Sequence, residues 1–228
     1  MFEHEADMTA TVVKWMRAMG LLPKAEFITP WGICDLVGVK FNRAKVARRL
    51  ELHQTKPVSS IVRAALLLMI PDVETQESTN LSKLVHACTS VIAQETVVRE
   101  VARLVREQFV VRSGPCSLQK LNGWVPLHER LVAVELKISR VAEVLAQARN
   151  NLGFADESFV GLPAGLARSV EADSVRRAEF ISAGVGLLGV RQRCCEMLIP
   201  AQPSRIVSDK ALQLYCVEKF WRCRVISS

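Results

Sequence analysis

The sequence predicts an α/β protein, of the α+β kind with a mixed sheet, and three patterns indicate this class. Apolar side chains at helical spacing run through residues 4–19. Two apolar runs within residues 25–39 meet at a proline and glycine turn, which is typical of a β-hairpin. The apolar run 131–138 alternates like a strand, and a helical pattern over 139–152 and another strand over 154–163 follow it. A strand, helix and strand in this order predict a parallel crossover, which together with the hairpin gives a mixed sheet.

The composition predicts a folded protein with a sizeable core, because half of the 228 residues are hydrophobic and 23% are charged. Acidic first residues, and no apolar run of about 18 residues, predict a cytoplasmic protein without a membrane span. Seven cysteines without a Cys-x-x-Cys pair argue against a disulfide framework or a zinc finger. The net charge of +7 permits a polyanionic partner such as nucleic acid but does not require one.

Two charged residues, Glu135 and Lys137, interrupt the otherwise apolar run 131–138. Side chains alternate along a strand, so both charges are expected on one face, with the even-numbered apolar residues on the other. Charges in such a strand are costly unless a function uses them. The alternative is a partly exposed strand whose two charges reach water.

A third charged residue, Asp35, lies inside the second apolar run of the hairpin, where it shares a face with Ile33 and Val37. An acidic residue in one core strand, followed after a long insertion by Glu-x-Lys in the next, resembles the PD-(D/E)XK (restriction-endonuclease-like) nuclease superfamily. The first motif is here Ile33-Cys34-Asp35, without the proline that often precedes the aspartate, and the second is Glu135-Leu136-Lys137.

The resemblance covers the first forty residues and residues 131–201, and it implies a restriction-endonuclease-like core. It also implies that Asp35, Glu135 and the Leu136 carbonyl hold one Mg²⁺ or Mn²⁺, since hard cations prefer oxygen ligands. Lys137 would orient or deprotonate the attacking water, or offset charge in the transition state, and its pKa can fall beside a metal.

Two residues on helices are further candidates for the catalytic site. Glu5, on the first helix, either points toward the Asp35 and Glu135 cluster, as in similar nucleases, or complements the positive end of the helix dipole. Gln147, on the helix after the Glu-x-Lys strand, is in the resemblance a residue beside the active site. A surface glutamine is the other explanation.

Between the two nuclease motifs, three helical patterns and a hairpin around Gly114 follow one another in the order of a winged helix-turn-helix fold. The expected domains are a discontinuous nuclease-like domain of residues 1–42 and 126–228, and an inserted winged-helix domain of residues 43–125. Winged helices also serve as protein-interaction modules, so both roles stay open. The expected nucleic-acid contacts are Arg48, Arg49, Gln94, Arg99, Arg103, Arg106, Arg112 and Lys120.

After the second motif, residues 184–190 and 195–199 are expected as two further strands of the sheet. The glycines within 184–190 lack a following helix, so a dinucleotide-binding loop is rejected. The tail 209–224 is expected to be a helix that packs on the core or on a second copy of the chain, which leaves a homodimer open.

These patterns together predict a metal-dependent nuclease with duplex DNA as its partner and Mg²⁺ or Mn²⁺ as its cofactor. The first rival is a non-catalytic DNA-binding or regulatory protein on a nuclease-like scaffold. A structural partner in a larger nucleic-acid-processing complex is a third class.

Overall fold

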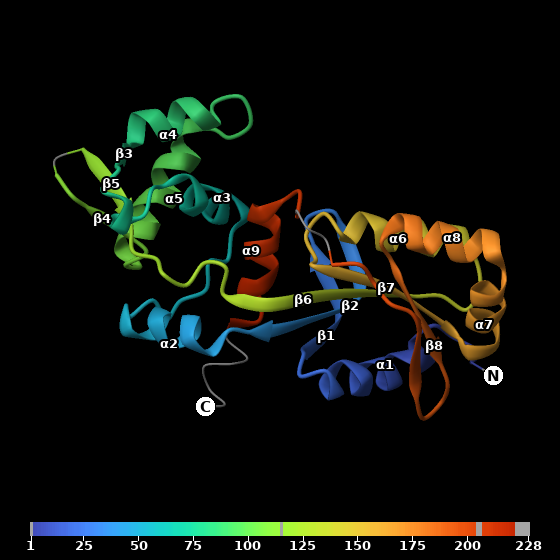
Figure 1. Cartoon of the computed structure of the whole chain (residues 1–228). Coiled ribbons are helices and arrows are strands. Elements are labelled where there is room, and N and C mark those ends of the chain that lie inside the picture. The colour runs from blue at the N-terminus through green and yellow to red at the C-terminus, as the bar shows by residue number, and fades with distance from the viewer. Residues whose placement is uncertain (1, 115, 204–206, 222–228) are drawn as a thin grey trace. The chain divides into compact units, whose positions relative to one another are not determined.

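The computed structural model describes residues 2–114, 116–203 and 207–221. The chain divides into two compact units, residues 1–40 with 129–209 and residues 41–128 with 210–228 (Figure 1). Residues 41–128 of the second unit separate the two segments of the first unit along the chain. The sequence-based division assigns the C-terminal helix to the nuclease-like domain, whereas in the structure it belongs to the second unit.

Among the described residues of the first unit, six strands form one mixed sheet, which confirms the α/β class. Its order is β1-β2-β6-β7-β8-β9. The pairs β1–β2 and β8–β9 are antiparallel, whereas β6–β7 and β7–β8 are parallel. The strands are β1 (Leu22–Thr29), β2 (Gly32–Phe41), β6 (His128–Leu136), β7 (Glu157–Pro163), β8 (Gly186–Val190) and β9 (Cys195–Ile199).

Helices cover both faces of this sheet. Helix α1 (Ala6–Ala18) packs on one face, where Met8, Val12 and Met16 contact the even-numbered residues of β6 and Phe159 of β7. Helices α6 (Val141–Asn151), α7 (Ala164–Ala172) and α8 (Ser174–Ala183) share a core with Val160 and Leu162 on the other face. The alternation of β7 between these two cores explains why it reads as a continuous apolar run.

The expected apolar face of the Glu-x-Lys strand is confirmed for Val132, Val134 and Leu136, which are buried against α1. Ile138, the fourth residue predicted for this face, lies beyond β6 and is 37% exposed. The strand itself ends one residue before Lys137, which lies beyond β6. Helix α6 provides the crossover from β6 to β7, and the parallel pairing expected there is confirmed.

The second unit contains the expected order of three helices and a hairpin. In its described part, three short strands pair in the order β3-β5-β4, and α3 and α4 both contact α5. Residues 79–80 form the strand β3, which pairs with β5. The elements are α2 (Arg43–Glu51), α3 (Ile61–Met69), the 3₁₀ turn Val73–Thr75, β3 (Thr79–Asn80), α4 (Leu81–Cys88), α5 (Gln94–Arg106), β4 (Val110–Arg112), β5 (Ser117–Lys120) and α9 (Lys210–Glu218).

A buried ion pair joins the C-terminal helix to the second unit. Glu218 of α9 binds the guanidinium of Arg49 with both carboxylate oxygens and accepts the Val58 N–H at 2.7 Å. The rings of Trp124 and Trp221 flank the Arg49 guanidinium, at 4.5 and 3.9 Å from ring centroid to Cζ. Two charges removed from water in this way require each other, which explains why α9 packs on α3 in this unit.

This burial corrects one prediction. Arg49, expected to contact nucleic acid, has no exposed surface, and its remaining N–H groups donate to the carbonyls of Gln54 and Lys56. Its guanidinium is therefore part of the core. The tail helix is confirmed over 210–218, and residues 222–224 of its predicted span lie outside the described residues.

Candidate active site

Asp35 and Glu135 lie on the neighbouring strands β2 and β6, as predicted. The backbone N–H of Leu136 donates to Asp35 Oδ2 at 2.7 Å, which fixes one carboxylate against the end of the other strand. Glu135 is only 7% exposed. Burial raises the pKa of Glu135, and the nearby negative charge of Asp35 raises it further, although a hydrogen bond from Asn151 opposes both. The site therefore holds two carboxylates so close that the charge of Asp35 disfavours the ionised form of Glu135.

Asn151, at the end of α6, is a site residue that the sequence analysis misses. Its Nδ2 donates to Glu135 Oε1 at 2.7 Å and lies 3.6 Å from the Cys34 sulfur. Gln147, the residue predicted for this role, is exposed, and its place beside the carboxylates is taken by Asn151 one helical turn later. Gln147 and Asn151 are four residues apart, so both side chains lie on one side of α6. The prediction therefore chose the correct helix but a residue one helical turn too early.

Lys137 and Glu5 form an ion pair, with 3.0 Å between Nζ and Oε2. Glu5 stands at the N-terminal end of α1, where it also suits the helix dipole, so both interpretations of this residue describe part of its surroundings. The hydrogen bond and charge of Glu5 raise the pKa of Lys137. With Glu5 as its partner, Lys137 is held as an ammonium.

The donor set suits a hard divalent cation in part. Asp35 and Glu135 offer adjacent carboxylate oxygens, and Mg²⁺ is commonly bound through one or two carboxylates and several waters. Among the described residues, no group of three or more histidine, cysteine, aspartate or glutamate side chains is arranged to hold a metal ion. Within that part of the chain, Asp35 and Glu135 therefore have no third side-chain ligand of these types. The Leu136 carbonyl stays a predicted ligand. A cation would relieve the repulsion between the two carboxylates.

We predict that Glu135→Gln stabilises the protein at neutral pH when a chelator is present. The raised pKa of Glu135 means that the folded state binds this proton more tightly than the unfolded state does. The stability that this proton adds to the folded state is fully present below the unfolded pKa of about 4.3, and it is lost as the pH rises through the folded pKa. Glutamine avoids the loss and can still accept from Asn151.

The measurement is a melting temperature across pH 4 to 8 for the wild type and for Glu135→Gln. The advantage of the variant should shrink as the pH falls toward 4. Glu179→Gln, an exposed change on α8, is the matched control and should follow the wild type. A variant that melts below the wild type at pH 7 would contradict the prediction.

A stripe of arginines follows the outward side of α5 in the second unit. Arg99, Arg103 and Arg106 are exposed and are spaced i, i+4 and i+7, so they lie on one face of the helix. Gln94, in the first turn, is exposed as well. In a winged-helix order this third helix is the one that enters the major groove, and guanidinium groups suit phosphate.

A buried arginine holds the carboxylates beneath this stripe. Arg63 of α3 binds Glu100 at 2.8 Å and Glu107 at 3.3 Å, and it is 2% exposed. Burial alone would raise the pKa of Glu100, but the hydrogen bond and charge of Arg63 outweigh it and the pKa is lowered. Because Arg63 satisfies both carboxylates, their longer contacts of 3.5 Å with Arg99 and Arg103 leave the stripe accessible.

The remaining predicted contacts of the second unit differ in exposure. Arg112 of β4 is exposed, and Arg48 of α2 is exposed beside Glu51. Lys120 of β5 is half-buried, and burial lowers its pKa even though Asp72 opposes the shift. Lys120 is therefore less suited to a phosphate contact than the arginines.

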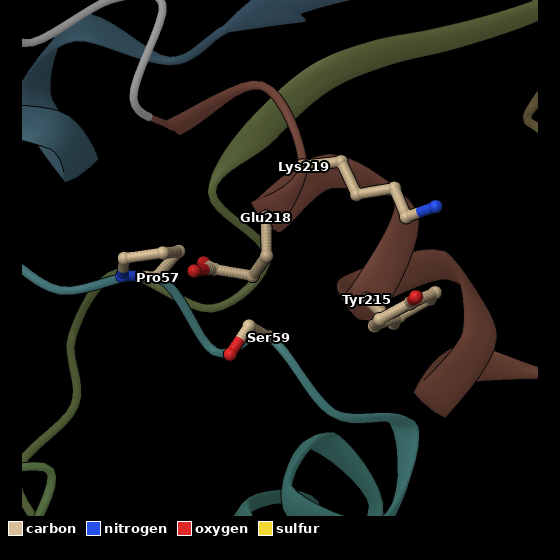
Figure 2. Close-up of a pocket in the computed structure, with 5 residues that line it drawn as sticks. All are labelled: Pro57, Ser59, Tyr215, Glu218 and Lys219. Atoms are coloured by element: carbon tan, nitrogen blue, oxygen red, sulfur yellow. The ribbon is translucent and has the colours of Figure 1, made fainter. Parts of the chain in front are cut away.

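Figure 2 shows a pocket of about 290 Å³ in the second unit, lined by Pro57, Ser59, Tyr215, Glu218 and Lys219. The Glu218 side chain points toward the segment that contains Pro57 and Ser59, where its carboxylate is already bound by Arg49 and the Val58 N–H. One side of the pocket is therefore formed by a buried carboxylate, that of Glu218, whose charge is already balanced by Arg49.

Comparisons with known proteins give no family. No protein-family model matches the chain, and no curated protein does. Among solved structures, the chain is similar to the SPO1766 protein of unknown function from Silicibacter pomeroyi, with 18% identity and a TM-score of 0.27, over 57% of this chain and 87% of that chain. This similarity is too low to indicate a shared fold or function.

The class of this protein therefore follows from its own secondary structure and sheet topology. It is a mixed α/β protein with two carboxylates on the neighbouring inner strands β2 and β6 of its sheet, and with a second unit of helices and short strands. No helix in the described ranges has the length and apolar character needed to cross a membrane.

Proposed function

We propose that this protein is a metal-dependent nuclease that hydrolyses phosphodiester bonds of duplex DNA, with Mg²⁺ or Mn²⁺ as its cofactor. The observation that supports this best is the meeting of Asp35 and Glu135 on adjacent strands, with Lys137 just past the end of one of them. The order of α1, the antiparallel pair β1–β2, β6, α6 and the parallel β7 is the order that the restriction-endonuclease-like resemblance implies.

The two carboxylates and the Leu136 carbonyl would hold the cation. When bound, Mg²⁺ or Mn²⁺ supplies the Lewis acid that activates water and neutralises phosphate charge. The Leu136 N–H keeps Asp35 in place, and Asn151 orients Glu135. These contacts give the site the preorganisation that electrostatic catalysis needs.

Lys137 is proposed as a stabiliser of charge on the phosphate. The ion pair with Glu5 holds the ammonium form, which suits a cation that offsets developing negative charge. Its partner Glu5 would position the ammonium. Glu5 is thus a positioning residue.

The second unit is proposed to bind DNA through the stripe on α5, with Arg112 and Arg48 as further phosphate contacts. We expect the double change Arg99→Ala and Arg103→Ala to weaken duplex binding and to flatten its salt dependence by about one unit of slope for each lost phosphate contact. Fluorescence anisotropy at several salt concentrations measures both quantities.

The matched control is Arg176→Ala with Arg177→Ala, two exposed arginines of α8 whose loss gives the same change in net charge. The control should keep the wild-type slope. Equal slopes for all three proteins would assign the second unit to protein contacts. Relaxed sequence preference with an unchanged slope would instead indicate base contacts.

The proposed activity is tested by incubating the purified full-length protein with linear, supercoiled, single-stranded and branched DNA and with RNA, with and without Mg²⁺ or Mn²⁺. Cleavage should require the cation, and Asp35→Asn should abolish it. DNA binding without cleavage under any of these conditions would favour the non-catalytic DNA-binding alternative.

A further inference from the structure

The tip of the β1–β2 hairpin exposes a small apolar patch in the first unit. Trp31 is 77% exposed, and the cross-strand pair Ile28 and Ile33 is 62% and 65% exposed. The other tryptophans are different, since Trp124 and Trp221 are buried and Trp15 packs edge-on against Phe159. An indole held in water in this way loses the burial that tryptophan usually gains.

Two hydrogen bonds hold the turn that carries Trp31. The Trp31 N–H donates to Thr29 Oγ1 at 3.2 Å, and the same hydroxyl donates to the Gly32 carbonyl at 2.9 Å. Gly32 has a φ of +143°, a conformation that favours glycine. The hairpin therefore presents the ring from a fixed backbone, which lowers the entropy lost when the ring binds something.

The patch is close to the candidate active site along the chain, because Trp31 immediately precedes β2, the strand that carries Asp35. Trp31 precedes Asp35 by four residues, a span of about 13 Å at the rise of a β-strand. Successive phosphates of one DNA strand are about 3.4 Å apart along the duplex axis, so the ring lies within about four base steps of the candidate metal ligands.

We propose that Trp31 stacks on a nucleobase of the bound DNA, close to the phosphate that is cut, with Ile28 and Ile33 packing beside it. This inference rests on the proposed nuclease function. A single flat ring suits any base, because every base has a π-face. Hydrophobic side chains also act as wedges between base steps and unstack them.

A second copy of this chain is the less suitable occupant. An exposed patch of three side chains offers on the order of a few hundred Å². A stable interface buries about 800 Å² on each partner, so this patch alone is too small to hold a dimer together. Stacking on a base needs only the indole face.

The test is the binding of labelled single-stranded and duplex oligonucleotides to the full-length protein in chelator, measured by fluorescence anisotropy. Trp31→Ala should weaken binding about tenfold, whereas Trp31→Phe should keep most of the affinity, since stacking accounts for the effect. The salt slope should not change, because no charge is lost. Val175→Ala removes another exposed apolar side chain of the same unit and should bind like the wild type.

Acrylamide quenching provides a second readout, because Trp31 dominates the accessible fluorescence and DNA should shield it. Unchanged affinity of Trp31→Ala, or equal losses in the Ala and Phe variants, would overturn the stacking. If sedimentation shows a wild-type dimer that Trp31→Ala converts to a monomer with unchanged DNA affinity, the patch is an interface between copies and the proposal is wrong.

The two proposals fail in distinguishable ways. Metal-dependent cleavage by the wild type, with wild-type DNA affinity in Trp31→Ala, would overturn stacking alone. If DNA binding depends on Trp31 but no cleavage occurs, the nuclease proposal is wrong and the stacking proposal remains supported. A wild-type protein that binds no nucleic acid would overturn both.

Discussion

Lys137→Ala is expected to lower the rate of DNA cleavage by at least about a hundredfold, the scale of losing a charge stabiliser or a general base. The side chain follows the last residue of β6 and pairs with a partly exposed Glu5. An exposed or partly exposed ion pair contributes little to stability, so the variant should fold. Single-turnover cleavage and a melting curve measure the two effects separately.

Two further variants distinguish the role of Lys137. Lys137→Arg keeps the positive charge and should retain a substantial part of the rate if the residue offsets phosphate charge, whereas a general base could not be replaced in this way. Glu5→Gln removes the positioning partner and should cost less than Lys137→Ala. Wild-type cleavage by Lys137→Ala would remove the residue from the mechanism, and a variant that does not fold would make it structural.

Glu218→Ala is expected to lower the free energy of unfolding of the second unit by about 3–5 kcal/mol. The change leaves the fully buried Arg49 guanidinium without its bidentate partner and the Val58 N–H without its acceptor. Chemical denaturation followed by tryptophan fluorescence measures it, because Trp124 and Trp221 flank this guanidinium.

The matched control is Glu51→Ala, which removes an exposed carboxylate 3.7 Å from Arg48 and should cost less than about 1 kcal/mol. Replacing Arg49 and Glu218 together by Met should recover much of the loss, because no uncompensated charge then stays buried. A Glu218→Ala variant as stable as the wild type would mean that Arg49 finds water or another partner in solution.

The sequence alone was enough to predict the elements of the first unit that have a clear period. The alternation of 131–138 predicted which residues of β6 share its apolar face, and the strand, helix and strand order predicted the parallel pairing with β7. These patterns are local, because side chains two positions apart on a strand, or four apart on a helix, lie on the same face. The meeting of Asp35 with Glu135 required in addition the motif order of a known superfamily.

Only the tertiary structure decided which polar side chains are buried and with what partners. Arg49 and Glu218 are 169 positions apart, and neither has a flanking pattern that distinguishes it from a surface charge. Asn151 replaces Gln147 beside Glu135 because the end of α6, and not its middle, reaches the carboxylates. Periodicity fixes the face of a helix but not the point along its axis where another strand passes. That point depends on how the helix packs, which is a property of the whole core.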